Sequence, residues 1–180
     1  MVNELFWQIV EDAKSRAGKN QERQLQLIAK RLESISDSDL LTFCRSLAEL
    51  LHRADSWDLV NAVAVMEGWV SDDFFEYWRA ALLLQGQSVV EQAIQDPDSL
   101  ADQEYFDRCQ DFLDLPWTEF QRRHGEDAVP PSPHLGDNIQ GPNPISQWQQ
   151  LLLKYPRLMR KYWGRWPYGS PVYPDATPID

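Results

Sequence analysis

Four acidic side chains on two neighbouring segments are the residues of this sequence best placed for chemistry. They are Asp58 in one predicted helix and Asp72, Asp73 and Glu76 at the start of the next. A short turn joins these helices, and carboxylates from adjacent helices bind divalent metal ions in helical bundles. The same residues have a simpler role, because acids favour the first turn of a helix and Glu76 stands three residues before Arg79. The sequence favours this structural role over a metal site.

A second candidate is a small polar group in the middle of the predicted bundle. Residues 57–69 are apolar on nearly every side of a helix, which is typical of a helix buried among others. Asp58 and Asn61 interrupt this helix, and buried polar groups need hydrogen-bonding partners. Arg79 is the partner that we expect for Asp58. The three residues form a candidate polar core, either an ion pair that fixes the helix register, which we favour, or a polar pocket.

The histidines and cysteines show no pattern typical of catalysis or of zinc binding. His52 falls on a polar helix face, His124 at a helix end and His134 in a proline-rich stretch. The paired Glu-x-x-His signature of bundle metal sites is absent, no Cys-x-x-Cys spacing is present, and no glycine loop would cradle a phosphate. Cys44 and Cys109 lie on apolar helix faces, where thiols are unreactive. We therefore expect no catalytic residue and no cofactor.

Charge is unevenly distributed along the 180-residue chain, whose formal net charge is −11. Residues 49–120 carry 16 acids and three bases, whereas residues 147–166 carry five bases and no acid. The negative total argues against a nucleic-acid partner, because phosphates repel acidic proteins. No apolar stretch approaches the roughly 20 residues of a membrane span, and the first residues do not resemble a secretory signal. We expect a cytoplasmic protein without a membrane span.

The basic segment near the C-terminus also carries large apolar side chains. Residues 146–166 have the pattern of an amphipathic helix, which Pro156 would kink or restart. We expect this element to fold back on the acidic bundle; the alternatives are a second copy, another protein or an anionic surface, and last a stacked nucleic-acid strand. The candidate partner-binding residues are Trp148, Tyr155, Arg157, Arg160, Lys161, Trp163 and Trp166.

The elements that would position these residues are helices, because apolar residues recur at intervals of three and four. The pattern predicts an all-α fold: a single irregular or orthogonal bundle of six to eight helices. One helix is expected from residue 98 or 99 to Leu113, and a short one from Pro116 to Phe120. The predicted parts are the bundle over residues 1–124, a proline- and glycine-rich loop over 125–145, the basic aromatic helix over 146–166 and an extended tail over 167–180.

Several short motifs give the chain a resemblance to a known family. They are Phe6-Trp7, Trp57-Asp-Leu, Ser71-Asp-Asp-Phe-Phe-Glu-Tyr-Trp-Arg, Gln85-Gly and Asp96-Pro-Asp-Ser-Leu-Ala. In their order and spacing, over about residues 4–102, the chain resembles the uncharacterised bacterial family called domain of unknown function 4240. This resemblance implies a small helical cytoplasmic domain and supplies no reaction, cofactor or catalytic residue. The chain departs from the family at Arg79-Ala-Ala, where members carry a second aromatic residue after the arginine.

These observations favour a non-catalytic protein-interaction or regulatory module. An acidic surface would speed the encounter with a basic partner protein, as in helical inhibitor or immunity proteins, which are an analogy only. The alternative is a divalent-metal-dependent hydrolase, or a small-ligand-binding protein, that uses the carboxylates of Asp58, Asp72, Asp73 and Glu76. A further alternative is a structural homo-oligomer held together by residues 146–163.

Overall fold

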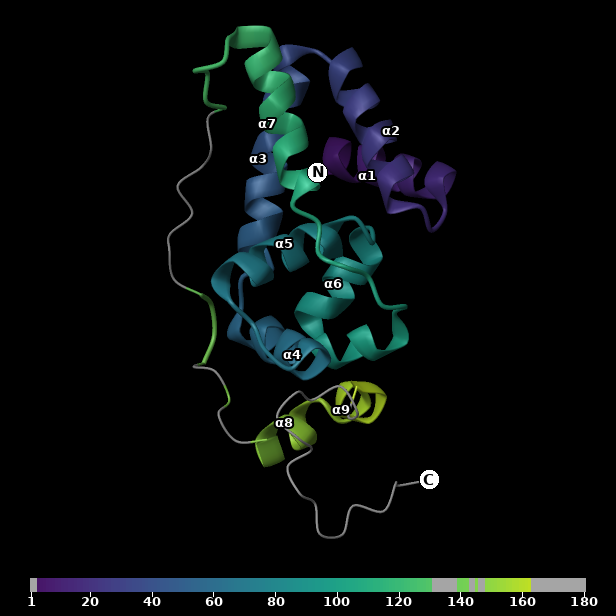
Figure 1. Ribbon diagram of the computed structural model, residues 1–180, viewed down its shortest axis with the longest axis vertical. Helices are drawn as coiled ribbons and strands as arrows, with labels where there is room; N and C mark the ends of the chain where they lie inside the picture. The colour runs from purple at the N-terminus through teal and green to yellow at the C-terminus, as the bar shows by residue number, and fades with distance from the viewer. Residues whose placement is uncertain (1–2, 131–138, 143–144, 146–147, 163–180) are drawn as a thin grey trace.

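The structure of the protein is a computed structural model that describes residues 3–130, 139–142, 145 and 148–162. Helices dominate the described residues, which contain no β-strand, so the predicted all-α fold is confirmed (Figure 1). No helix in these ranges is long and apolar enough to cross a membrane. The elements are α1 (Glu4–Ala17), α2 (Gln21–Ser34), α3 (Asp37–Arg53), α4 (Trp57–Glu67), α5 (Asp72–Leu83), α6 (Gln87–Gln95), the 3₁₀ helix η1 (Pro97–Asp102), α7 (Asp111–His124), α8 (Trp148–Lys154) and α9 (Pro156–Tyr162).

The helix starts follow from local side-chain chemistry. Helix α2 begins after Asn20, whose side chain accepts a hydrogen bond from a backbone N–H of the first turn. Ser36, Ser56 and Ser71 do the same for α3, α4 and α5. Helix α4 ends at Gly68, which adopts the left-handed conformation with a φ of 80°. Local chemistry alone therefore sets the helix ends at Asn20, Ser71 and Gly68.

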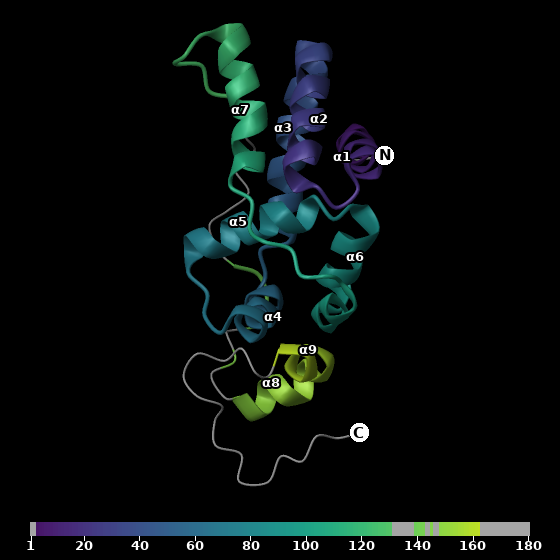
Figure 2. The ribbon, with the colours of Figure 1, turned by 45° about the vertical axis from the view of Figure 1, so that its right-hand side comes forward.

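The helices form an elongated molecule with α5 across its middle. Helices α1, α2, α3 and α7 make one end, α4, α6 and η1 lie on the other side of α5, and α8 and α9 make the opposite end (Figures 1 and 2). At the first end, the ring of Phe6 lies 4.8 Å from that of Phe43 and 6.2 Å from that of Phe112. In the middle, the fully buried Trp78 of α5 packs against Phe106, with 5.5 Å between ring centroids. A continuous apolar core therefore joins the two ends.

The helix predicted over residues 98–113 is wrong. Only η1 forms there, and residues 103–110 cross α5 without helical structure before α7 begins at Asp111. Phe106 and Cys109 are buried from this non-helical segment, and Cys109 donates its N–H to the carbonyl oxygen of Tyr77 at 2.9 Å. Pro116 lies inside α7 and does not begin a separate helix. Tertiary packing on α5 thus overrides the helical spacing of the apolar residues.

The segment that follows α7 is fastened to the corner between α3 and α4. Gln140 donates its N–H to the carbonyl oxygen of Asp55 and accepts the N–H of Trp57, both at 2.9 Å. Its side-chain amide also donates to the carbonyl oxygen of His52 at 2.7 Å. These bonds lead the chain to α4, directly before α8 begins.

Candidate functional site

Helix α9 lies against a face formed by α4 and η1, which we call the α4–η1 face, and α8 packs on α9 and reaches α4 through Lys154 (Figures 1 and 2). The two helices meet at Pro156, which is the first residue of α9 and whose missing N–H costs least at that position. Five apolar side chains of this segment are at most 5% exposed, whereas Leu152 and Leu153 are exposed; the buried ones are Leu151, Tyr155, Leu158, Met159 and Tyr162. Their burial makes hydrophobic packing the main source of the docking free energy.

Asp98 of η1 is the polar centre of this face. The residue is 6% exposed, and its two carboxylate oxygens accept the N–H of Arg157, each at 3.1 Å. One oxygen also accepts the N–H of Leu158 at 2.9 Å. A carboxylate buried without partners would be costly, as would free N–H groups at a buried helix start. Asp98 and the first turn of α9 therefore satisfy each other.

Cations of the docked segment surround this centre. Lys154 pairs with Asp58 at 2.5 Å, and Arg157 pairs with Asp102. The Arg157 hydrogen bond lowers the pKa of the Asp102 carboxyl. Lys161 donates to backbone carbonyls at the end of η1, including that of Ala101 at 2.8 Å. Because these pairs are half-exposed, they orient the segment more than they stabilise it.

The predicted polar core does not form one cluster. Arg79 pairs with Asp55 at 3.3 Å and donates to the carbonyl oxygen of Leu51 at 2.8 Å, instead of reaching Asp58. Asp58 lies on the side of α4 that faces the docked segment, where the Tyr155 hydroxyl also donates to its backbone carbonyl at 3.1 Å. The buried Asn61 accepts the N–H of Ile145 at 3.0 Å. Asp58 and Asn61 thus belong to the α4–η1 face, and Arg79 to the α3–α4 corner.

The four predicted metal ligands are not brought together. Within the described ranges, no three His, Cys, Asp or Glu side chains are arranged to hold a metal ion. Asp58 stands at the start of α4, whereas Asp72, Asp73 and Glu76 follow its end, and this 11-residue helix is about 16 Å long at 1.5 Å per residue. The short turn that joins the helices connects the wrong ends for a shared site.

The predicted partner-binding residues divide into three groups. Tyr155, Arg157 and Lys161 contact the α4–η1 face, as described above. Arg160 is exposed on the opposite side of α9 and has no ion-pair partner in the described part of the chain. Trp148 begins α8, its side chain lying outside the described structure, as Trp163 and Trp166 do entirely.

The sequence analysis did not identify the residues of η1 that receive α9. Asp98 and Asp102 were expected only as part of a helix that starts near residue 98, because Asp-Pro-Asp-Ser is a common helix-start pattern. Asp98 does stand near the start of η1, but its carboxylate turns to a second helix start, that of α9. No local feature of the sequence indicates that this acid is buried or which helix it contacts.

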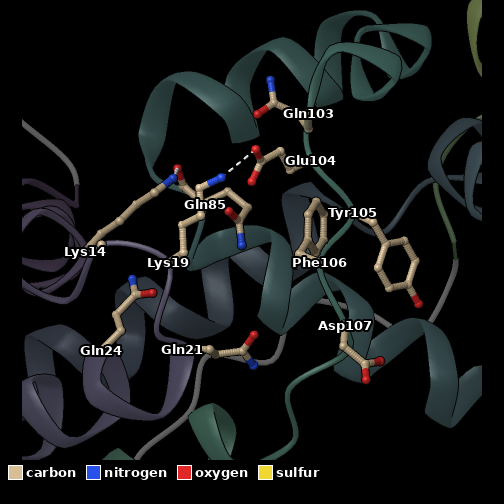
Figure 3. A pocket seen from close by; sticks show the side chains of 11 residues that line it. Lys14, Lys19, Gln21, Gln24, Gln85, Gln103, Glu104, Tyr105, Phe106 and Asp107 are labelled. Atoms are coloured by element: carbon tan, nitrogen blue, oxygen red, sulfur yellow. Dashed lines mark hydrogen bonds and ion pairs between the residues drawn. The ribbon is translucent and has the colours of Figure 1, made fainter.

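The cavity shown in Figure 3, of about 510 Å³, is a weaker candidate site. It lies between the α1–α2 turn and residues 103–107, and Lys19 pairs with Glu104 across it at 2.6 Å. Lys14, whose pKa is lowered by burial, donates to the carbonyl oxygen of Gln85. Gln24 donates to that of Leu84 at 3.0 Å. Lys14 and Gln24 thus satisfy carbonyls that directly follow α5, which is a structural role.

The two thiols are in unreactive surroundings. Burial raises the pKa of Cys44 to about 11 and also raises that of Cys109. Both side chains therefore stay protonated near neutral pH, and a thiol without its thiolate form is a poor nucleophile.

Comparison with known proteins supplies a family and no activity. No curated protein and no solved structure matches the chain. A family model described as a protein of unknown function (DUF4240) matches residues 1–122. The matched range contains α4 and η1 and ends before α8 and α9 begin, so the α4–η1 face lies inside it and the docked segment outside. The chain belongs to the DUF4240 family.

Proposed function

We propose that this protein is a non-catalytic interaction module whose α4–η1 face binds a basic amphipathic helix of a partner protein. The observation that carries the proposal is the contact of Asp98 with the first turn of α9, surrounded by buried apolar side chains. That contact supports a partner that offers a helix start together with apolar side chains. The face lies in the family range, and the helix that covers it is an addition outside this range.

Charge supports the same assignment. The region that builds the face is acidic, and the segment bound to it is basic. Complementary charge speeds the encounter of two proteins and disfavours wrong partners. A basic protein that is bound and inhibited, as by an immunity protein, would be one form of such a partner, by analogy alone.

The cis segment acts in this proposal as a resident ligand. Its attachment to the same chain gives it a high effective concentration, so a partner helix competes with it. A partner binds only the fraction of molecules whose face is open, which lowers its apparent affinity. The module would thus respond to partners that bind better than its own segment does.

We further propose that the protein acts in the cytoplasm and binds no nucleic acid. Its cysteines are free, which suits a reducing compartment, and its net charge of −11 opposes phosphate binding.

The test uses the full chain with its own segment released. Leu158 and Met159 are buried, so changing both to Asp should undock α9 and leave the face intact; we call this chain the released variant. A labelled peptide of residues 145–163 should bind the released variant at least about tenfold more tightly than the wild type, and more weakly as salt rises. Fluorescence anisotropy measures both.

A matched control tests whether release is specific. Leu153 is 84% exposed on the same segment, so Leu153→Asp should leave the face covered and peptide binding as weak as in the wild type. Circular dichroism would verify that each variant is folded. A folded released variant that fails to bind the peptide would contradict the proposed function.

A further inference from the structure

We infer that the partner is selected by where its helix begins, through a segment with the order basic, aromatic, proline, basic, apolar, apolar, any residue, basic, aromatic. This inference rests on the proposed function and adds the sequence class of the partner. In the chain itself the pattern is residues 154–162, Lys-Tyr-Pro-Arg-Leu-Met-Arg-Lys-Tyr. It is carried by the contacts on both sides of Pro156.

The register of the partner is fixed at Asp98. Its carboxylate accepts the N–H groups of Arg157 and Leu158, the two residues directly after Pro156. Only residues in the first turn of a helix have such free N–H groups, because later ones bond within the helix. If a partner helix began earlier or later in its sequence, the carboxylate would bind the N–H groups of other residues, and different side chains would then contact the α4–η1 face. Proline at the first position favours this start, since its φ is already helical.

The apolar residues of the partner are then selected by how they fit the α4–η1 face on one side of the helix. Counted from Pro156, the buried residues stand at −1, +2, +3 and +6: Tyr155, Leu158, Met159 and Tyr162. This spacing matches one face of a helix that starts at the proline. Moving the start by one residue would rotate these side chains by about 100°, away from the α4–η1 face.

The basic residues of the partner are selected by charge at the edge of the α4–η1 face. Lys154 faces Asp58, Arg157 faces Asp102, and Lys161 binds the carbonyls that end η1. They stand at −2, +1 and +5 from the proline. Arg160 at +4 is exposed and is not bound to the face, so this position is free in the pattern.

The experiment places the changes in the peptide, where they cannot unfold the protein. The probe is the labelled peptide of residues 145–163, bound to the released variant of the full chain. Inserting one Ala between Pro156 and Arg157 should weaken binding at least about tenfold, because either the proline or the side chains lose their register. Arg160→Gln removes a positive charge from the same helix but keeps the register, and it should therefore change the affinity less than about twofold.

A protein-side change tests the same register. Asp98→Ala in the released variant should weaken the native peptide at least about tenfold, because two N–H groups lose their charged acceptor. An unchanged unfolding midpoint would show that the face is still folded.

The two proposals fail in different ways. Equal binding of the native and the Ala-inserted peptides would overturn the inference about the helix start and leave the interaction module standing. If Arg160→Gln lowered the affinity as much as the insertion does, the inference about the helix start would also be overturned, because charge alone would then determine peptide affinity. Absence of native peptide binding would instead contradict the proposed function itself.

Discussion

Helices α7 and α9 are each held at one end of the molecule by a charged side chain, at most 13% exposed, that binds the backbone at a helix end. At the α7 end, Arg123 donates to the carbonyl oxygens of Leu32 at 2.6 Å and Ile35 at 3.0 Å, where α2 ends. At the α9 end, Asp98 accepts N–H groups where α9 begins. The arginine belongs to the helix that is being held, whereas the aspartate belongs to the surface that holds.

This difference separates a permanent element from an exchangeable one. Helix α7 brings its own anchor, and Glu119 of the same helix fixes the arginine with a hydrogen bond of 2.6 Å. Helix α9 brings only backbone N–H groups at the central contact, which any helix start offers. The α7 end is therefore specific to this chain, and the α4–η1 face is open to other helices of suitable side chains.

The largest effect is expected when the α7 anchor is removed. Arg123→Met should lower the free energy of unfolding of the whole protein by about 3 kcal/mol, because Glu119 and two carbonyls lose a buried partner. Urea unfolding measures this loss. Arg122→Met is the control, since Arg122 pairs with the same carboxylate from an exposed position, and its effect should be much smaller. Equal losses for both variants would remove the special role of Arg123.

Acid should weaken the same anchor. Hydrogen bonds from Arg122 first and Arg123 next hold the pKa of Glu119 at about 2, below its ordinary 4.5. A carboxyl with a lowered folded-state pKa stabilises the protein above its unfolded pKa, and this contribution is lost as pH falls from about 4.5 towards 2. The stability difference between wild type and Glu119→Gln should therefore shrink over that range, by less than the Arg123→Met loss. A stability difference between the two proteins that does not change with pH would contradict this role of Glu119.

Removing the α9 anchor should have a smaller and local effect. Asp98→Ala should lower the opening free energy of α9 by about 2 kcal/mol, measured by hydrogen exchange of its amides. The urea midpoint of the whole protein should move less, because most residues of the buried core belong to α1–α7 and only Leu151, Tyr155, Leu158, Met159 and Tyr162 come from the α8–α9 segment. Asp98→Asn keeps one acceptor oxygen, so its opening free energy of α9 should lie between those of the wild type and Asp98→Ala. Global unfolding that changes as much as α9 opening would make α9 a permanent element as well.

The sequence was sufficient where local chemistry decides the structure. Helix caps at Asn20 and Ser71 and the apolar spacing of α4 are local properties, and each is predicted from neighbouring residues. The all-α fold follows from the same spacing along the whole chain.

The sequence was insufficient where distant segments decide. Residues 103–110 have helical spacing but are held extended on α5 by burial of Phe106 and by the Cys109 N–H. Asp98 is another case, because its partners lie about 60 positions away. Arg79 was expected to pair with Asp58 because a buried acid needs a partner, but Asp58 pairs with Lys154, 96 positions away, and Arg79 pairs with Asp55. No local pattern specifies which ends meet.

The smallest expected effect concerns the charge pairs at the rim. Lys154 and Asp58 are each more than one-third exposed, so a double-mutant cycle of Lys154→Met and Asp58→Asn should give a coupling of about 0.5 kcal/mol in the opening of α9. Salt should reduce it further. The measurement is hydrogen exchange of the α9 amides at low and high ionic strength. A coupling as large as the Asp98→Ala loss would mean that charge fixes α9 more than the helix start does, and partners of the α4–η1 face would then share a charge pattern without sharing a register.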